Sequence, residues 1–357
     1  MRLNTRASLG RCWGLAAFLA LTACSSLLPE TLSVSPKVVE VERPCERAID
    51  LLERRETLSL DGRELKAYAE ACVDYGARPQ LGLALLGRAE QYLGDRSAST
   101  AALNAALKAE PDAGPGVWFA PLLALDARAT LFAARGDPLG ALNEIEVASG
   151  LLVRFTGVRY PNLISRLLSE RAAYLVLAGE EERAAADYER ALVIARNPAQ
   201  RFAVLRRAGW ADLASGRFAR AYRRLTQAYE LAPAMPQKLQ AALRIYAAEA
   251  QGLDRKRAMR GLERRVERDA LDLDLYPGII VRFLLDDIDA ETLRQRAREE
   301  SRLNPAAIKA QLDYYLGLRD LLDGESRSAQ AAFARAVDSD VVALPEYFFA
   351  RGAIGRL

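Results

Sequence analysis

The chain has 357 residues, of which 50 are Lys or Arg, 47 are Asp or Glu and none is His, so its formal net charge is +3. Hydrophobic residues make up 51% of the sequence, which is too high a share for an intrinsically disordered chain. The near balance of charge argues against a nucleic-acid-binding protein, and the absence of His excludes Ser-His-Asp or Cys-His catalysis and His-ligated zinc or haem. We therefore expect no cofactor and no metal ion.

Residues 1–23 have the layout of a removable export signal. Arg2, Arg6 and Arg11 precede a short apolar run from Trp13 to Leu21. That run is shorter than the about 20 residues that a membrane-spanning helix needs, and its length is typical of a signal peptide. The segment holds no acidic residue, so the rest of the chain has equal numbers of basic and acidic residues. The apparent basicity therefore belongs to the export signal.

The residues from Leu21 to Cys24 read Leu-Thr-Ala-Cys and resemble the lipobox of bacterial lipoproteins. The resemblance implies that the chain is cut before Cys24, which then carries a lipid. Ser25 and Ser26 follow where lipoproteins of the inner membrane carry Asp, so the resemblance implies the periplasmic face of the outer membrane. An ordinary signal peptide is the alternative. Residues 24–43 are rich in Ser and Pro and predict a flexible tether.

Residues 44–78 predict a helical hairpin with its turn at Leu60 to Gly62. Cys45 and Cys72 lie at similar distances from that turn. Such positions are side by side in an antiparallel hairpin, so we predict a disulfide between them in an oxidising compartment. In the chain-entropy model this bond adds about 3–4 kcal/mol of stability. Two buried free thiols are the alternative.

Residues 79–343 repeat a pattern of small and large apolar positions. Four positions recur three times at the same intervals. They are a first Gly, a turn Gly seven residues later, a large apolar residue nine residues after that and an Ala three residues further. The three sets are Gly87, Gly94, Leu103 and Ala106, then Gly209, Gly216, Leu225 and Ala228, then Gly317, Gly324, Phe333 and Ala336.

This pattern resembles the tetratricopeptide repeat, a helix–turn–helix unit of about 34 residues. The resemblance implies an all-α, tetratricopeptide-like solenoid of antiparallel helix pairs, with residues 344–357 as a C-terminal capping helix. Two stretches around Gly136 and Gly179 fit the pattern less fully, and residues 255–305 fit it poorly. A helical bundle without repeats is the alternative.

In tetratricopeptide arrays the first helix of each unit faces a concave groove that binds partner segments. Tyr, Trp and Arg are the residue types most often found at the energetic centres of protein interfaces. The resemblance therefore implies partner-binding residues on or near the groove, and a structural role is the alternative for each. They are Arg88, Tyr92, Arg166, Arg206, Trp210 and Tyr314.

Two charged stretches suggest other roles. The first contains four arginines at helical spacing, which predict either a patch for an anionic partner or a solvated helix face with ion pairs. These arginines are Arg257, Arg260, Arg264 and Arg268. The acidic residues from Asp286 to Asp289 lack the spacing of a known calcium loop, and a solvated helix end is the simplest interpretation.

The pattern as a whole predicts a scaffold without catalytic activity, held to the membrane by a lipid on Cys24. It would bind protein partners of a cell-envelope assembly, such as pilus or secretion, outer-membrane or polysaccharide-export machinery, and no nucleic acid. One alternative is an envelope hydrolase or lyase that uses carboxylates such as Asp286 or Asp287. Another is a binder of anionic glycans through the four arginines from Arg257 to Arg268.

Overall fold

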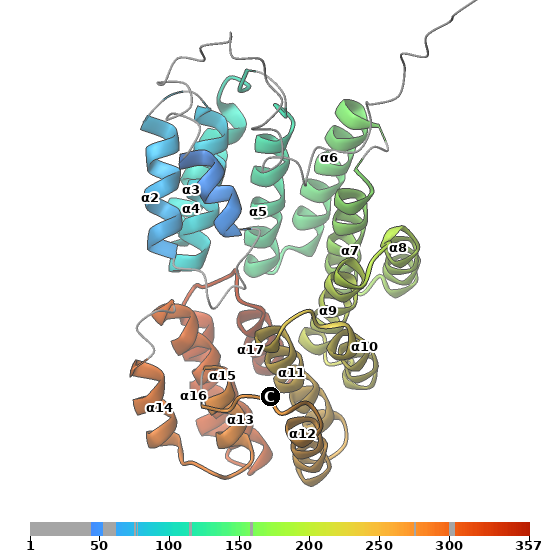
Figure 1. The fold of residues 1–357 in the computed structure, drawn as a ribbon, viewed down its shortest axis with the longest axis vertical. Coiled ribbons are helices and arrows are strands. Elements are labelled where there is room, and N and C mark those ends of the chain that lie inside the picture. The colour runs from blue at the N-terminus through green and yellow to red at the C-terminus, as the bar shows by residue number, and fades with distance from the viewer. Residues whose placement is uncertain are drawn as a thin grey trace, which may run out of the picture. The chain divides into compact units, whose positions relative to one another are not determined.

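The computed structural model describes residues 44–52, 62–74, 76, 78–113, 116–157, 160–274, 276–299 and 304–357. The predicted export signal, the lipidation site Cys24 and the tether 24–43 lie outside these residues. The described part of the chain is helical and contains no β-strand, which confirms the predicted all-α class. Figure 1 shows the helices following one another along the chain as packed neighbours.

Residues 44–52 form the first helix, and most later helices form consecutive antiparallel pairs. The later helices are α2 (Gly62–Asp74), α3 (Pro79–Leu93), α4 (Arg96–Lys108), α5 (Phe119–Arg135), α6 (Pro138–Thr156), α7 (Pro161–Ala178), α8 (Glu181–Ile194), α9 (Pro198–Ala214), α10 (Phe218–Leu231), α11 (Met235–Gly252), α12 (Arg255–Asp269), α13 (Gly278–Leu284), α14 (Ala290–Glu299), α15 (Pro305–Leu322), α16 (Ser326–Asp338) and α17 (Pro345–Ile354).

The turn between α3 and α4 shows why the sequence forms pairs. Gly94 has a φ of 83°, a left-handed conformation that glycine adopts without steric cost, and its N–H donates to the Glu90 carbonyl. The side chain of Asp95 then accepts a hydrogen bond from the Ala98 N–H at 2.8 Å and caps α4. A Gly-Asp dipeptide therefore ends one helix and starts the next.

The small residue of each repeat unit lies against the large apolar residue of the same unit. A Cβ atom on Gly87 would lie 2.5 Å from the side chain of Leu103, and a Cβ on Gly209 would lie 2.5 Å from that of Leu225. The helices of a pair approach closely because these glycines have no side chain. The packing thus explains why the sequence repeats this pattern of residue sizes.

The stretch that fits the repeat poorly, residues 255–305, contains short helices. Helix α12 still pairs with α11, but α13 has only 7 residues and α14 only 10. The turn from α11 to α12 at Leu253 does not use a left-handed glycine. The lack of a repeat pattern in this stretch therefore coincides with a change in helix length.

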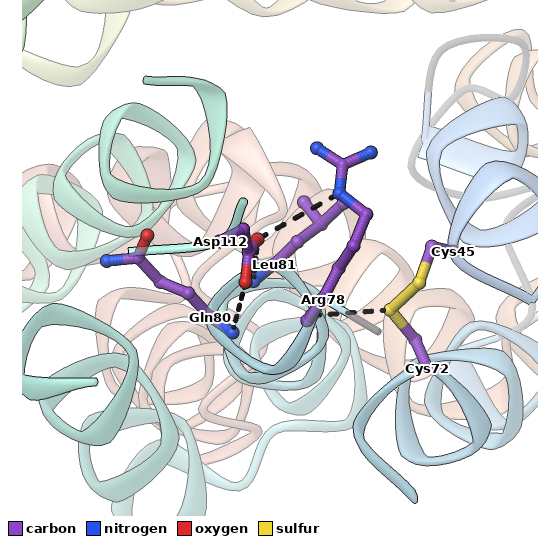
Figure 2. Close-up of a disulfide and its surroundings, with 6 residues drawn as sticks. All are labelled: Cys45, Cys72, Arg78, Gln80, Leu81 and Asp112. Atoms are coloured by element: carbon purple, nitrogen blue, oxygen red, sulfur yellow. Dashed lines mark hydrogen bonds and ion pairs between the residues drawn. A yellow bond between two sulfur atoms is a disulfide. The ribbon is translucent and has the colours of Figure 1, made fainter. Parts of the chain in front are cut away.

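The structure contains the predicted disulfide between Cys45 and Cys72, which joins the helix at 44–52 to α2 (Figure 2). Both cysteines are buried. The N-terminal end of the adjacent α3 is capped by a residue that follows α4 in the sequence. The Asp112 carboxylate accepts hydrogen bonds from the N–H groups of Gln80 at 3.0 Å and Leu81 at 3.1 Å. Both features hold the start of the array in place.

Helix α17 packs against helices far from it in sequence. The Tyr347 hydroxyl donates to the Ala134 carbonyl at 3.1 Å, and Arg351 donates to the Ala133 carbonyl at 2.9 Å, both at the C-terminal end of α5. Cationic groups are favoured at this end of a helix. Helix α17 also contacts α9, so its contacts extend beyond those of an end cap on its neighbour α16.

Candidate functional site

A group of charged side chains joins the first helices of consecutive pairs. Asp126 on α5 and Glu170 on α7 are only 3% and 7% exposed. Arg166 on α7 binds both, through Nη2 to Asp126 Oδ2 at 2.6 Å and through Nε to Glu170 Oε1 at 3.0 Å. Together with Arg88 on α3 and Arg207 on α9, these residues form what we call the Arg166 cluster.

Arg207 connects the Arg166 cluster to α9, and Arg88 on α3 interacts electrostatically with Asp126 and Glu170. Arg207 donates to Glu170 Oε1 at 3.0 Å and to the Ser169 hydroxyl at 2.7 Å. Arg88 donates to the side chain of Gln91 at 2.9 Å. The Arg166 side chain remains 41% exposed although it binds two carboxylates. We call the surface formed by α3, α5, α7 and α9 around these residues the cluster face.

The two carboxyl groups of the Arg166 cluster titrate in different ranges. Burial, followed by the negative charge of Asp126, raises the pKa of Glu170 to about 7. Burial would also raise the pKa of Asp126, but the charge of Arg166 and a hydrogen bond from the Glu170 carboxyl lower it. Glu170 is therefore protonated below neutral pH, while Asp126 stays ionised.

Arg206 and Trp210, both predicted to bind a partner, lie on α9 one helical turn apart. The Arg206 guanidinium stands over the Phe202 ring at 5.6 Å. The Trp210 ring lies 5.1 Å from the ring of Phe348 on α17. Helix α17 therefore already occupies the surface next to Trp210.

The remaining two predicted residues, Tyr92 and Tyr314, are 7% and 1% exposed. The Tyr314 ring contacts the rings of Phe333 at 5.8 Å and Phe349 at 5.6 Å. The Tyr92 carbonyl accepts a hydrogen bond from Asn304 at 2.6 Å. Both tyrosines thus contribute to packing within the chain, and the candidate site is centred on the arginines.

The four arginines predicted as an anionic patch lie on α12 and are exposed. Arg257 pairs with Glu249 at 3.3 Å, and Arg268 pairs with Asp269 at 2.8 Å. Arg260 and Arg264 carry no ion pair to another described residue. Half of the patch is therefore balanced by neighbouring acids, and half is open to an anionic partner.

The acidic stretch considered for catalysis borders a cavity of about 510 Å³ between α13 and α16. The Asp286 carboxylate is bound by Arg255 at 2.7 Å and by Arg319. Arg319 also binds Asp323 at 2.8 Å. Asp287 is exposed and is not among the residues that line the cavity. The structure thus places Asp286 in a network of alternating charges.

Within the described ranges we find no group of three or more His, Cys, Asp or Glu side chains suited to a metal ion. The same ranges contain no helix that is long and apolar enough to cross a membrane. No family model matches the chain, and no curated protein matches it. The candidate site therefore rests on the geometry of the chain itself.

Three residues of the Arg166 cluster, Asp126, Glu170 and Arg207, were not predicted from the sequence. Asp126 stands alone among apolar residues in α5, a helix whose segment reads Leu-Leu-Ala-Leu-Asp-Ala-Arg. A single acid on a buried helix indicates a partner in another helix, because an unpaired buried charge is costly. That pattern could have identified Asp126, but it does not say which arginine binds it.

Proposed function

We propose that the chain is a lipid-anchored scaffold without catalytic activity, which binds a protein partner of a cell-envelope assembly through the cluster face. The observation that carries this proposal is the Arg166 cluster. Its charged side chains come from the first helices of four consecutive pairs, and the Arg166 side chain is 41% exposed. Arginine is enriched at the energetic centres of protein interfaces because one guanidinium makes several hydrogen bonds.

The architecture supports a tetratricopeptide-like solenoid as the form of this scaffold. Each pair contacts the next along the chain, and the contact of a small Gly with a large apolar residue recurs within pairs. In a solenoid the first helices of successive units line one continuous surface. Arg88, Asp126, Arg166 and Arg207 come from four such first helices.

A partner-capture experiment tests this proposal. The full chain is used to capture proteins from envelope extracts by chemical crosslinking, and Arg206→Glu is compared with Arg223→Glu. Both variants change the net charge equally, but Arg206 lies on the first helix α9 and Arg223 is exposed on the second helix α10. We expect Arg206→Glu to lose the partner and Arg223→Glu to retain it. Equal capture by both variants would overturn the proposal.

The proposed anchor has a separate test. Cys24 is the lipidation site implied by the lipobox resemblance, and at least two acyl chains are needed for stable membrane attachment. We expect Cys24→Ser to move the chain from the membrane fraction to the soluble fraction, with unchanged partner capture. Full retention of this variant in the membrane fraction would contradict lipid anchoring.

Binding of an anionic glycan through α12 is a second candidate, favoured by the exposed Arg260 and Arg264, which form no ion pair with another described residue. Such binding should weaken with salt, because charges on a surface are screened beyond about 10 Å at 0.1 M ionic strength. We expect a variant with both arginines changed to Gln to lose glycan binding. The carboxylate hydrolase has less support, since the Asp286 oxygens are already bound by Arg255 and Arg319.

A further inference from the structure

The cavity of about 510 Å³ lies among α13, α14, α15 and α16, on other helices than the cluster face (Figure 1). Its volume is within the range of about 300–1,000 Å³ that is typical of small-molecule sites. Phe283 from α13 and Leu316 from α15 are each 6% exposed and give the cavity an apolar surface, which Ile288 and Ala290 extend. The other lining residues are polar, and most of them are charged.

One wall of the cavity is a network of ion pairs within the chain. Asp323 and Asp286 both bind Arg319 of α15. Both also bind Arg255 of α12, Asp286 at 2.7 Å and Asp323 at 2.8 Å. Because each charge in this network already has partners of opposite sign, we expect the wall to fix the shape of the cavity rather than to bind a charged group of a ligand.

Two other arginines of the cavity are only partly engaged. Arg294 on α14 is 42% exposed and pairs with Glu291 of the same helix at 3.7 Å. Arg335 on α16 is 48% exposed and binds Asp313 through Nε at 2.9 Å. In the part of the chain that the structure describes, neither guanidinium has a second ion pair. Since a guanidinium has five N–H donors, both arginines can still bind a carboxylate in the cavity.

One carboxylate of the cavity is partly engaged as well. Asp320 on α15 accepts a hydrogen bond from the Ser328 hydroxyl through Oδ2, and no other described side chain donates to it. Ser328 and Arg335 are seven residues apart on one face of α16, about 10 Å along the helix axis. The cavity therefore offers an acceptor near one end of this face and donors near the other.

The charges at the cavity balance once Arg255 is included. The four carboxyl groups are those of Asp286, Asp289, Asp320 and Asp323, and the four guanidinium groups are those of Arg255, Arg294, Arg319 and Arg335. The carboxyl groups would repel a multiply charged anion such as phosphate, and the guanidinium groups would repel a cation. The balance favours a ligand that carries one charge of each sign.

We propose that this cavity binds a small zwitterion with an apolar body, of about the length of a dipeptide. The ligand's carboxylate binds the guanidinium groups of Arg294 and Arg335, and its ammonium group donates to Asp320. Its apolar body lies against Phe283 and Leu316. This site is independent of the proposed scaffold function, because none of its residues belongs to the cluster face.

Isothermal titration calorimetry of the purified full chain with the dipeptide Leu-Leu tests this inference. We expect a dissociation constant of about 0.1–1 mM, which is usual for a ligand of this size. The C-terminal amide of Leu-Leu lacks the carboxylate, and the N-acetyl form lacks the ammonium group. Each should bind about five-fold more weakly, the size of one partly exposed ion pair. Free leucine should also bind more weakly, since its two charged groups are closer together.

Variants of the charged residues assign each end of the ligand. Arg294→Gln and Arg335→Gln should each weaken binding of Leu-Leu about five-fold and should reduce its advantage over the amide. Asp320→Asn should remove the advantage of Leu-Leu over the N-acetyl form. Arg327→Gln and Asp338→Asn are the matched controls, exposed on α16 outside the cavity, and should leave binding unchanged.

Circular dichroism of each variant verifies that the helices remain folded. Arg294→Gln removes only a pair with the exposed Glu291, so it keeps the test valid if Arg335→Gln does not fold. Absence of binding at millimolar Leu-Leu would overturn the inference, as would equal binding of Leu-Leu, its amide and its N-acetyl form. Unchanged binding in Arg294→Gln and Arg335→Gln, or binding of phosphate or free leucine at least as tight as that of Leu-Leu, would also overturn it.

Discussion

The pairs α5–α6 and α7–α8 have similar sequences at their turns but different surroundings. Each first helix ends at a left-handed glycine, Gly136 with a φ of 85° and Gly179 with a φ of 84°. A Cβ atom on Gly136 would lie 2.1 Å from the Arg351 guanidinium of α17, whereas a Cβ on Gly179 would have no neighbour within 4 Å. Only the first of the two turns supports the C-terminal helix.

This difference shows that the turn pattern determines local conformation, while tertiary contacts depend on residues far away in sequence. The pair α5–α6 holds α17 through the carbonyl groups of Ala133 and Ala134. The pair α7–α8 instead carries Arg166 and Glu170. Among the described residues, neither of these two side chains contacts α17. We therefore expect substitutions at the α17 contacts to change stability and substitutions in the Arg166 cluster to change binding.

The largest expected effect is at Gly352 in α17. A Cβ atom there would lie 2.0 Å from the Ala214 carbonyl oxygen at the end of α9, a backbone atom that cannot easily move. We expect Gly352→Ala to destabilise the protein by about 2–3 kcal/mol, because overpacked side chains force the helices apart. Urea denaturation measures this change.

Gly150 on α6 provides the matched control for Gly352. It also lies within a helix, but a Cβ atom on it would have no neighbour within 4 Å. Gly150→Ala should therefore stabilise the protein by about 0.5–1 kcal/mol, the usual gain from alanine in a helix. If Gly352→Ala is as stable as Gly150→Ala, then α17 does not dock against α9 and the comparison fails.

An intermediate effect is expected at Glu170, which belongs to the pair α7–α8. Because its pKa is raised on folding to about 7, the protonated carboxyl stabilises the folded chain at low pH. This stabilisation is fully present below the ordinary glutamate pKa of about 4.3 and is lost as the pH rises through neutrality. Near pH 8, Glu170→Gln should therefore be about 1–2 kcal/mol more stable than the unmodified chain.

Thermal denaturation at several pH values measures this effect of Glu170. The advantage of Glu170→Gln should shrink as the pH falls below neutrality and vanish below about pH 4. Glu189, exposed on α8, is the control, because Glu189→Gln should leave the pH dependence unchanged. An unchanged pH profile for Glu170→Gln would show that folding does not raise the pKa of Glu170.

The helix pairs could be predicted from the sequence because their determinants are local. The Gly-Asp dipeptide at Gly94 and Asp95 and the interval from Gly87 to Leu103 lie within one unit. The disulfide could be predicted for the same reason, since Cys45 and Cys72 are separated by 27 residues in adjacent helices.

The docking of α17 could not be predicted in this way, because its contacts join residues that are far apart in the chain. Arg351 and the Ala133 carbonyl are 218 residues apart, and no repeat pattern relates them. The same limit applies to the Arg166 cluster. Arg88 and Arg166 were predicted from the first-helix pattern, but Asp126 binds Arg166 across 40 residues and depends on how two pairs pack.

The smallest expected effect compares Gly136 and Gly179 directly. Replacing either by Ala places a side chain at a left-handed φ, which should cost about 1 kcal/mol in both variants. Gly136→Ala should cost about 1 kcal/mol more, because the new Cβ displaces the Arg351 guanidinium from the carbonyls that end α5. Adding Arg351→Ala to both variants should remove this difference, since the displaced group is then absent. The free energies of unfolding of the double variants are compared by urea denaturation. If Gly136→Ala still costs more than Gly179→Ala when Arg351 is absent, the difference lies in the turns themselves and not in the contact with α17.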